Sequence, residues 1–460
     1  MAQKVYDLAI LGSGPGGYVA AVRAAQLGSK VALVEVADLG GVCLNRGCIP
    51  TKTLVECARV FVQAQRAGEF GVRIAGVAVD FPAMMARKAR VVETLRRGVE
   101  GLMKRYQVEV IRGRGRLLDR HRLAIRAGDG EEVISAQRII IATGSAPVRP
   151  AMFPFDGKAV LTSDEALNLD YLPASVLIVG GGYIGCEFAG FFSALGTQVT
   201  IVEVMERLIP HTDEEIAGEL LRSFKKRRVT VHLGTRVESM VTGAGGVRAK
   251  LASGQEVAAE KVIVSVGRQP NVSDLGLETA GVRVENGAVA VDEHCQTSVP
   301  NIYAIGDVTG KVMLAHAASY QAKVAVEHMY GRERRADYHV MPAVFFTSPQ
   351  VGTVGLSETQ AKGRGFRVRC VCTPFQVLGK AHALGETSGF IKIVAEEKTG
   401  EVLGVHIIGP EATSLIAEAA LALRLECTVE ELANTIHAHP TLPEGIMEAA
   451  EAWLGHPIHG

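Results

Sequence analysis

The apolar positions of the first 35 residues fall into two short runs separated by a glycine-rich turn and a helical stretch. Val5–Leu11 is typical of a buried strand, Tyr18–Leu27 of a helix, and Lys30–Val34 of a second strand. Between the first strand and the helix, residues 12–17 read Gly-Ser-Gly-Pro-Gly-Gly. The pattern therefore predicts a β-α-β unit with a glycine turn where the helix begins.

The glycines of this turn have the spacing of a dinucleotide-binding fingerprint. Gly12 would make the tight turn, Gly14 would let the backbone approach a pyrophosphate, and Gly17 would let helix and strand pack closely. The helix N-terminus offers N–H donors to phosphate groups. Glu35, at the end of the second strand, is placed to accept hydrogen bonds from a ribose.

The same pattern returns in the middle of the chain. Strand 176–179 leads into a turn with Gly180, Gly182 and Gly185, and a later strand ends at Glu203. The first glycine precedes the acidic residue by 23 positions in both copies. Two fingerprints in matching context predict two nucleotide sites. A membrane span is the alternative for the apolar second copy, but three consecutive glycines and the repeat argue against it.

Three further apolar segments end in a glycine turn, at 138–144, 261–267 and 301–307. Asp307, which closes the last of them, could hold a sugar hydroxyl or polyol, although an ordinary aspartate turn is the alternative. From residue 340 the chain changes to strands followed by helices, with a capping box at Thr428 to Glu431. We expect an α/β protein with two Rossmann-like nucleotide-binding domains and a C-terminal α+β domain.

Composition narrows the class of protein. Forty-nine basic and forty-nine acidic residues cancel, which disfavours a nucleic-acid or acidic lipid surface as partner. Hydrophobic residues make up 48% of the 460-residue chain, and 51 glycines fit a compact α/β protein. Eight cysteines are too few for a secreted disulfide framework, and the N-terminus lacks a signal-peptide pattern. We therefore expect a cytoplasmic protein in a reducing compartment, where any disulfide would be a working one.

Two of these cysteines lie in a glycine-rich loop, residues 40–52 (GGVCLNRGCIPTK). In a regular helix the Cα atoms of Cys43 and Cys48 would be roughly 7.5 Å apart. A disulfide needs about 4.4–6.8 Å. A bridge would therefore need a distorted turn, which the glycines permit. Buried inert thiols or half of a zinc site are the alternatives, and no second cysteine pair with zinc spacing follows.

A third chemical motif lies near the C-terminus. His439 precedes a proline, and Glu444 begins a predicted helix from which it could orient the imidazole. A histidine–carboxylate pair is an effective general acid–base device because imidazole titrates near neutral pH. The alternative is a surface loop with two histidines.

Two nucleotide sites and a dithiol together imply electron transfer through a flavin, which can link hydride chemistry to thiol chemistry. The dithiol follows the first fingerprint, so we expect FAD there and the nicotinamide nucleotide at the second. Glu203 suits the free 2′-hydroxyl of NAD and would repel the 2′-phosphate of NADP. Arg207 is the one nearby residue that leaves this choice open.

Taken together, these motifs resemble the flavin-dependent pyridine nucleotide–disulfide oxidoreductases over residues 4–457, and most of all the members that oxidise dihydrolipoamide with NAD. The resemblance implies segments 1–150 (FAD-binding, with the disulfide), 151–271 (NAD-binding), 272–341 (completing the FAD site) and 342–460 (dimerisation). It implies a homodimer whose partners are the lipoyl domains of 2-oxoacid dehydrogenase complexes or the glycine-cleavage carrier protein. No metal site is expected.

The resemblance also assigns roles to individual residues. Those implied in catalysis are Cys43, Cys48, Lys52, Glu187, His439 and Glu444, with the last two serving the other subunit's disulfide. Those implied in FAD binding are Gly12, Gly14, Gly17, Glu35, Lys52, Thr143, Gly144, Asp307 and Ala315. Those implied in NAD binding are Gly180, Gly182, Gly185, Glu203 and Gly267.

Two other functions stay open on the sequence alone. An NAD(P)H-dependent reductase of another disulfide would share every motif, and only the preference of Glu203 for NAD over NADP argues against it. A flavoprotein that binds NAD(H) without turnover would need neither the dithiol nor the histidine–glutamate pair, all of which are present.

Overall fold

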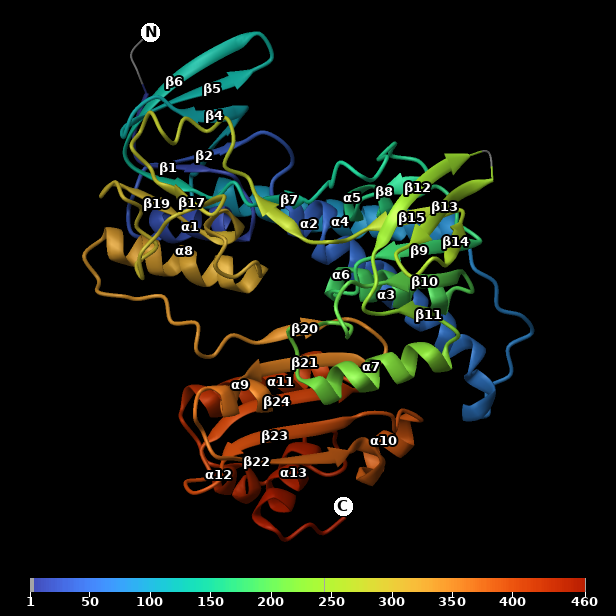
Figure 1. Ribbon diagram of the computed structural model, residues 1–460. Helices are drawn as coiled ribbons and strands as arrows, with labels where there is room; N and C mark the ends of the chain where they lie inside the picture. Colours follow the sequence, from blue (N-terminus) through green and yellow to red (C-terminus); the bar gives the residue numbers. More distant parts are fainter. Residues whose placement is uncertain (1–3, 244, 460) are drawn as a thin grey trace.

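The computed structural model describes residues 4–243 and 245–459, and three main sheets organise them (Figure 1). The first sheet has the order β3-β2-β1-β6-β5-β4, with β19 pairing on β6. Strands β1, β2, β3 and β19 run parallel to their neighbours, whereas β4 and β5 are antiparallel additions. The bounds are β1 Lys4–Leu11, β2 Val31–Glu35, β3 Glu109–Arg112, β4 Arg114–Leu117, β5 Arg122–Ala127, β6 Gly130–Ile141 and β19 Ile302–Ala304.

Helices cover one face of this sheet. Alanine side chains of α1 (Pro15–Gln26) pack against α8 (Ala315–Met329), and the C-terminal half of α4 (Phe81–Arg105) joins the same apolar cluster. The small alanines let α1 and α8 approach closely. Strand β19 and helix α8 are far along the chain from β1, so residues from the central segment return to complete the first nucleotide-binding sheet.

The second sheet repeats this design with parallel order β11-β10-β9-β15-β8. Helices α3, α6 and α7 pack on one face, and an antiparallel sheet β12-β13-β14 covers the other. The bounds are α3 Cys48–Gln65, α6 Tyr183–Ala194, α7 Glu214–Lys226, β8 Val160–Leu161, β9 Ser175–Val179, β10 Gln198–Val202, β11 Thr230–His232, β12 Val237–Gly243, β13 Gly246–Leu251, β14 Glu256–Ala259 and β15 Lys261–Val264.

The third sheet is antiparallel, in the order β20-β21-β24-β23-β22. Helices α11 and α13 pack on one of its faces, whereas α7 of the second unit crosses the other side (Figure 1). The bounds are β20 Ala343–Phe345, β21 Gln350–Gly355, β22 Val368–Pro374, β23 Phe390–Glu396, β24 Val402–Gly409, α9 Glu358–Gly363, α10 Gly379–Leu384, α11 Ala412–Arg424, α12 Val429–Asn434 and α13 Glu444–Leu454.

Short elements connect these units. They are α2 Gly41–Arg46, α5 Ser163–Ala166, the paired strands β7 Ser145–Pro147 and β16 Arg268–Pro270, the pair β17 Val284–Glu285 and β18 Ala288–Val289, and three 3₁₀ turns at Ala67–Phe70, Gly306–Thr309 and Phe375–Val377. Among the described residues, no helix is both long and apolar enough to cross a membrane.

The predicted fold class is confirmed. The first helix begins at Pro15, three residues earlier than predicted, because proline fits the first helical position, where no N–H partner is needed. The capping box is present at the start of α12. The Thr428 side chain accepts from the backbone of the first turn, and the Glu431 side chain accepts from the Thr428 backbone N–H. Strands β21 and β22 were not predicted, because their partly polar patterns resemble those of loops.

Candidate active site

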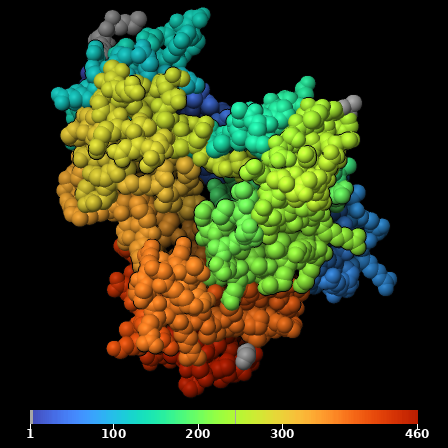
Figure 2. All heavy atoms as spheres, viewed as in Figure 1, coloured from blue at the N-terminus to red at the C-terminus, as the bar shows by residue number. Residues whose placement is uncertain are grey.

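A cavity of about 580 Å³ lies between the first and second sheets. The space-filling view shows a hollow between the yellow residues of the central segment and the green residues of the second unit (Figure 2). Its lining includes the first glycine turn, the cysteine motif, Lys52, Glu187 and Asp307. The carboxyl edge of a parallel sheet is the usual place for a ligand in such folds.

The first glycine turn has no room for side chains where it packs, and open space where it faces the cavity. A Cβ on Gly12, whose φ is +98°, would lie 2.3 Å from the carbonyl oxygen of Ala142. A Cβ on Gly17 would lie 1.8 Å from the carbonyl oxygen of Gly12. A Cβ on Gly14 would meet nothing closer than 4.0 Å, at the Cα of Gly41. Gly14 therefore presents bare backbone to the cavity, as close approach of a pyrophosphate requires.

The second turn is built in the same way. A Cβ on Gly180 (φ +110°) would lie 2.4 Å from the carbonyl oxygen of Ser265, and one on Gly185 only 2.0 Å from the carbonyl oxygen of Gly180. A Cβ on Gly182 would meet no atom within 4 Å. Both turns thus satisfy the steric requirement for a nucleotide, which supports a fit to two nucleotide cofactors.

An acidic residue is fixed beside each turn by backbone donors. Glu35 is buried, and its carboxylate accepts from the Ser13 N–H at 2.9 Å, the Ser13 hydroxyl at 2.6 Å and the Ala37 N–H at 2.8 Å. Glu203 is also buried and accepts from the N–H groups of Gly181 and, at 2.8 Å, of Met205. These contacts hold each carboxylate at the edge of its turn, where a ribose would lie.

The two cysteines lie on either side of a helix break. Cys43 is in α2, Gly47 follows the last residue of that helix, and Cys48 is the first residue of α3. Gly47 has φ −146° and ψ −110°, so the backbone leaves helical geometry between the two residues. The predicted distorted turn is therefore present, and both cysteines are free thiols that line the cavity.

The pKa values of the two thiols are shifted in opposite directions. The hydrogen bond donated by Cys43, with help from the Lys52 ammonium, lowers the pKa of Cys48 to about 7 despite partial burial. The same contact with Cys48, together with burial, raises the pKa of Cys43. When the pair is reduced, the thiolate therefore resides on Cys48, at the start of α3, where the helix dipole also favours negative charge.

Lys52 and Glu187 form an ion pair between α3 and α6. The Lys52 ammonium lies 2.8 Å from both carboxylate oxygens of Glu187, which is 3% exposed. The backbone N–H of Phe346 donates to the same carboxylate at 2.9 Å. This explains the single charge in the apolar helix α6: Glu187 lines the cavity and pairs with Lys52, whose ammonium also acts on Cys48.

The predicted residues Thr143, Gly144, Asp307 and Ala315 also line the cavity. Thr143 exchanges two hydrogen bonds with Asn271, at 2.8 and 2.9 Å, which joins the first unit to the end of the second. Gly267 does not line the cavity itself, although its neighbour Arg268 does.

Ser145, Arg268 and Tyr183 are among the lining residues that were not predicted from the sequence. Arg268 donates to the hydroxyl of Ser145 at 2.8 Å, and that hydroxyl donates to Asp307 at 2.5 Å. Tyr183, in the second glycine turn, lines the cavity and stacks on Phe345 with 6.0 Å between ring centroids. Their positions next to predicted glycine turns were the only signal in the sequence.

The histidine–glutamate pair forms as predicted. Nδ1 of His439 lies 2.9 Å from a carboxylate oxygen of Glu444, at the start of α13. Burial raises the pKa of Glu444, but hydrogen bonds from the Thr441 N–H and the imidazole outweigh it and lower the pKa overall. The imidazole is 78% exposed. Neither residue lines the cavity of its own chain.

Two nucleotide turns, a dithiol and an acid–base pair on this fold define a flavin-dependent oxidoreductase acting on a disulfide. Residues 6–322 match the family of pyridine nucleotide-disulphide oxidoreductases, and residues 341–450 match its dimerisation domain. The chain belongs to this family, which uses FAD and NAD(H), and carries the part through which its members form homodimers.

Two relatives that match along nearly the whole chain carry the same name. The chain is 44% identical to dihydrolipoyl dehydrogenase of Bacillus subtilis, with 99% of each chain covered. It is 42% identical to the enzyme of the same name from Geobacillus stearothermophilus, covering 98% of this chain and 96% of that one. These names agree with the activity predicted from the sequence.

Solved structures agree on the fold. LpdA of Mycobacterium tuberculosis superposes with a TM-score of 0.91 at 30% identity, covering 98% of this chain and 99% of that one. The flavoprotein disulfide reductase RclA of Escherichia coli, solved as a Cu(II) complex, gives a TM-score of 0.89 at 28% identity and covers 98% of this chain and 100% of that one.

Proposed function

We propose that this chain is a dihydrolipoyl dehydrogenase that oxidises protein-bound dihydrolipoamide through Cys43 and Cys48 and reduces NAD⁺ to NADH. The observation that carries the proposal is the dithiol at the Gly47 helix break, with a low-pKa thiol on Cys48 beside Lys52. The full-length relatives with that name support it.

The chain's own residues account for the thiol chemistry. His439 would take the proton of a dihydrolipoyl thiol, and Glu444 would hold the imidazole tautomer and stabilise its cation. The substrate thiolate would attack the Cys43 sulfur, forming a mixed disulfide and releasing Cys48 as a thiolate. The second substrate thiol would then attack the mixed disulfide, releasing lipoamide and returning Cys43 as a thiol. The pair Cys43–Cys48 is thereby reduced by two electrons.

The cofactors would occupy the two turns. We propose that the turn at Gly12, Gly14 and Gly17, with Glu35, holds FAD and that the turn at Gly180–Gly185, with Glu203, holds NAD. When bound, FAD supplies the two-electron link between the dithiol and the nicotinamide. Lys52, held by Glu187, would stabilise negative charge on Cys48 and beside the flavin ring.

The acid–base pair would act on the other subunit. His439 is exposed in the single chain and lies outside its own cavity, so a partner must bring Cys43 to it. This is consistent with the dimerisation domain at residues 341–450. We propose functional segments at 1–150, 151–271, 272–341 and 342–460, because the third segment supplies β19, Asp307 and α8 to the first sheet.

The same proposal implies which proteins carry the substrate and where the enzyme acts. The dihydrolipoamide would come from lipoyl domains of a 2-oxoacid dehydrogenase complex or from the glycine-cleavage carrier protein, and the enzyme would be cytoplasmic. A reductase of another disulfide driven by NADPH is the competing function, and Glu203 argues against it because a 2′-phosphate would meet a buried carboxylate.

An anaerobic titration separates these functions. The purified holoenzyme receives dihydrolipoamide, then NAD⁺ or, in a second sample, NADP⁺, while the flavin spectrum is recorded. We expect a long-wavelength thiolate–flavin band, followed by nicotinamide reduction with NAD⁺ only. An unchanged spectrum with dihydrolipoamide, together with flavin reduction by NADPH, would reject the proposal.

Two variants test the assigned cysteines in the same experiment. Cys43→Ser should abolish turnover with dihydrolipoamide while leaving Cys48 to form its thiolate. Cys295→Ser removes a buried thiol outside the cavity and is the matched control. Equal activity of the Cys43→Ser variant and wild type would contradict the assignment.

A further inference from the structure

The segment between Glu203 and Asp213 surrounds the second glycine turn. Gly181, the middle glycine of that turn, donates its N–H to Glu203 and accepts a hydrogen bond from the Ile209 N–H at 2.8 Å. A Cβ on Gly181 would lie 2.7 Å from the Leu208 side chain, so the segment packs directly on the turn. Its position therefore fixes the shape of the nucleotide-binding backbone.

Ile209 holds this segment in a strained conformation. Its φ is +41°, in the left-handed region that β-branched residues rarely adopt, and its side chain is buried. A strained residue keeps its conformation only where the surrounding structure imposes it. The next constraint along the chain is Thr212, whose N–H and hydroxyl both donate to the Ile209 carbonyl, at 3.0 and 2.8 Å.

Asp213 then anchors the segment to the third sheet. It is the N-cap of α7, where it accepts from the Glu215 N–H at 3.1 Å. Both of its carboxylate oxygens also accept from Lys392 of β23, at 3.1 and 3.0 Å. Asp213 and Lys392 are each 2% exposed, so this ion pair is buried where the second unit meets the dimerisation sheet.

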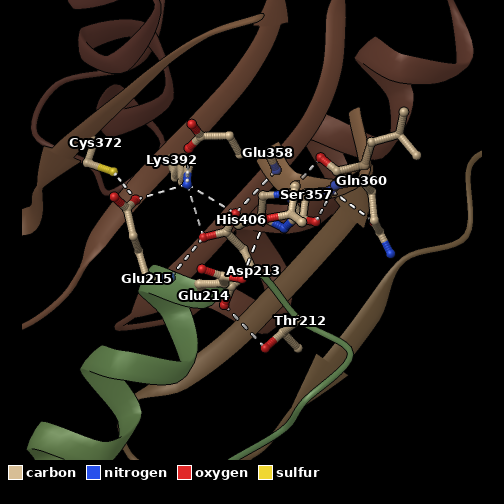
Figure 3. A network of polar contacts seen from close by, with 12 residues as sticks. Thr212, Asp213, Glu214, Glu215, Ser357, Glu358, Gln360, Cys372, Lys392 and His406 are labelled. Atoms are coloured by element: carbon tan, nitrogen blue, oxygen red, sulfur yellow. Dashed lines mark hydrogen bonds and ion pairs between the residues drawn. The ribbon is translucent and has the colours of Figure 1, made fainter. Parts of the chain in front are cut away.

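Two more carboxylates surround the same ammonium (Figure 3). Glu215 and Glu358 each lie 3.0 Å from Lys392, and the Cys372 thiol donates to Glu215. Burial lowers the pKa of Lys392, but the three carboxylates outweigh it and raise the pKa overall. Lys392 therefore stays charged, and it is the cation on which all three carboxylates converge.

These contacts form a continuous path from β23 to the nucleotide turn: Lys392, Asp213, Thr212, Ile209 and Gly181. We propose that Lys392 is a positioning residue for the nicotinamide nucleotide, acting through Asp213 to hold the strained Ile209 segment against the second glycine turn. The inference rests on the proposed use of that turn by NAD(H). It makes the dimerisation sheet part of the nucleotide site through Lys392, in addition to the direct contact of Phe345 in β20 with Tyr183 beside the glycine turn.

The test compares two lysine-to-methionine variants that both remove a cation from Glu358. Lys392→Met removes the path to Asp213. Lys362→Met removes an exposed lysine 2.6 Å from Glu358 that has no ion pair with Asp213. For each holoenzyme, the rate of flavin reduction is measured against NADH concentration by stopped flow, which gives an apparent Kd for NADH. Flavin reduction by dihydrolipoamide is measured separately.

We expect Lys392→Met to raise the apparent Kd for NADH by about two- to thirtyfold, the usual range for residues that couple through a packed network. Lys362→Met should match wild type, and dihydrolipoamide should reduce all three proteins at the same rate. An unchanged Kd for NADH in Lys392→Met would overturn the proposal. An equal fall in both half-reactions would also overturn it, because it would indicate general damage.

A second variant covers the case in which Lys392→Met does not fold. Asp213→Asn keeps a side chain that can cap α7 but removes the charge that pairs with Lys392. It should raise the Kd for NADH in the same direction, and a wild-type value would reject the proposal. Failure of wild type to react with dihydrolipoamide would reject the proposed substrate instead, because the NADH measurement does not depend on it.

Discussion

In the second glycine turn, we predict that one substitution changes the affinity for NADH without changing the stability of the protein. Gly182 and Gly185 are three residues apart, yet an alanine methyl has very different surroundings at each. At Gly182 the backbone has φ −72° and an added Cβ meets no atom within 4 Å. At Gly185 it lies 2.0 Å from the carbonyl oxygen of Gly180 and 2.9 Å from the Ser265 hydroxyl.

These surroundings set the expected stabilities. In Gly182→Ala, the poorer N-cap costs up to about 1 kcal/mol. The reduced entropy of the unfolded chain offsets about 0.4–1 kcal/mol of that. The Tm should therefore stay within about 2 °C of wild type. In Gly185→Ala the helix must move away from the strand, which costs about 1–3 kcal/mol or more. For a cooperative unit of about 150–250 residues, a loss of about 1–3 kcal/mol corresponds to a fall in Tm of about 2–12 °C.

The affinity for NADH should be lowered by Gly182→Ala, although this variant keeps its stability. The methyl of Gly182→Ala enters the space where backbone N–H groups would approach the pyrophosphate. Loss of one hydrogen bond to a charged group costs about 1.5–3 kcal/mol, equivalent to about 10- to 150-fold weaker NADH binding. The assay is thermal unfolding followed by the NADH dependence of flavin reduction. Wild-type NADH affinity in Gly182→Ala would refute the assignment of this turn to the nucleotide.

Three further predictions concern the chemistry of the site. Glu444→Gln removes the charge that supports the His439 imidazolium, so flavin reduction by dihydrolipoamide should slow at least about 100-fold while reduction by NADH is unchanged. If the variant and wild type react with dihydrolipoamide at similar rates from pH 6 to 8, Glu444 does not have this role. Glu203→Gln keeps the hydrogen bonds from the glycine turn but removes the repulsion of a 2′-phosphate, so the NAD/NADP ratio of kcat/KM should fall about tenfold or more; an unchanged ratio would contradict it. Because the pKa of Cys48 is lowered to about 7, the thiolate band of the reduced enzyme should be present above that pH and disappear below it, and Lys52→Met should move the midpoint upward, which a spectroscopic pH titration would detect; a downward shift would be inconsistent with the electrostatics.

The parts of the site that lie close together in the chain could be predicted from the sequence. The glycine turns, Glu35 and Glu203, the helix break between the cysteines and the pairing of His439 with Glu444 all depend on spacings of 23 residues or fewer. Such features follow from local geometry: glycine where a Cβ has no room, proline where a helix starts, and a carboxylate five residues after an imidazole. The structure shows them at the predicted residues.

Other parts of the site depend on residues far apart in sequence. Lys52 and Glu187 are separated by 135 positions, and Ser145 and Asp307 by 162. Lys52 and Glu187 were assigned roles only by resemblance to a family, and the contact of Ser145 with Asp307 was not expected at all. No periodicity links such residues, because their contacts are created by tertiary packing, which places α3 against α6 for the first pair and β7 against the Gly306–Thr309 turn for the second.

The network around Lys392 shows the same division between local and tertiary information. In the sequence, Lys392 is the one charged residue in the apolar run FIKIVA at residues 390–395, and Asp213 stands just before the helix that begins at Glu214. Only the packing of α7 on the third sheet buries both, and a buried charge is tolerated only when an opposite charge faces it. The sequence determined the two glycine turns, whereas the tertiary structure decided that Lys392, 179 positions from Asp213, forms an ion pair with it.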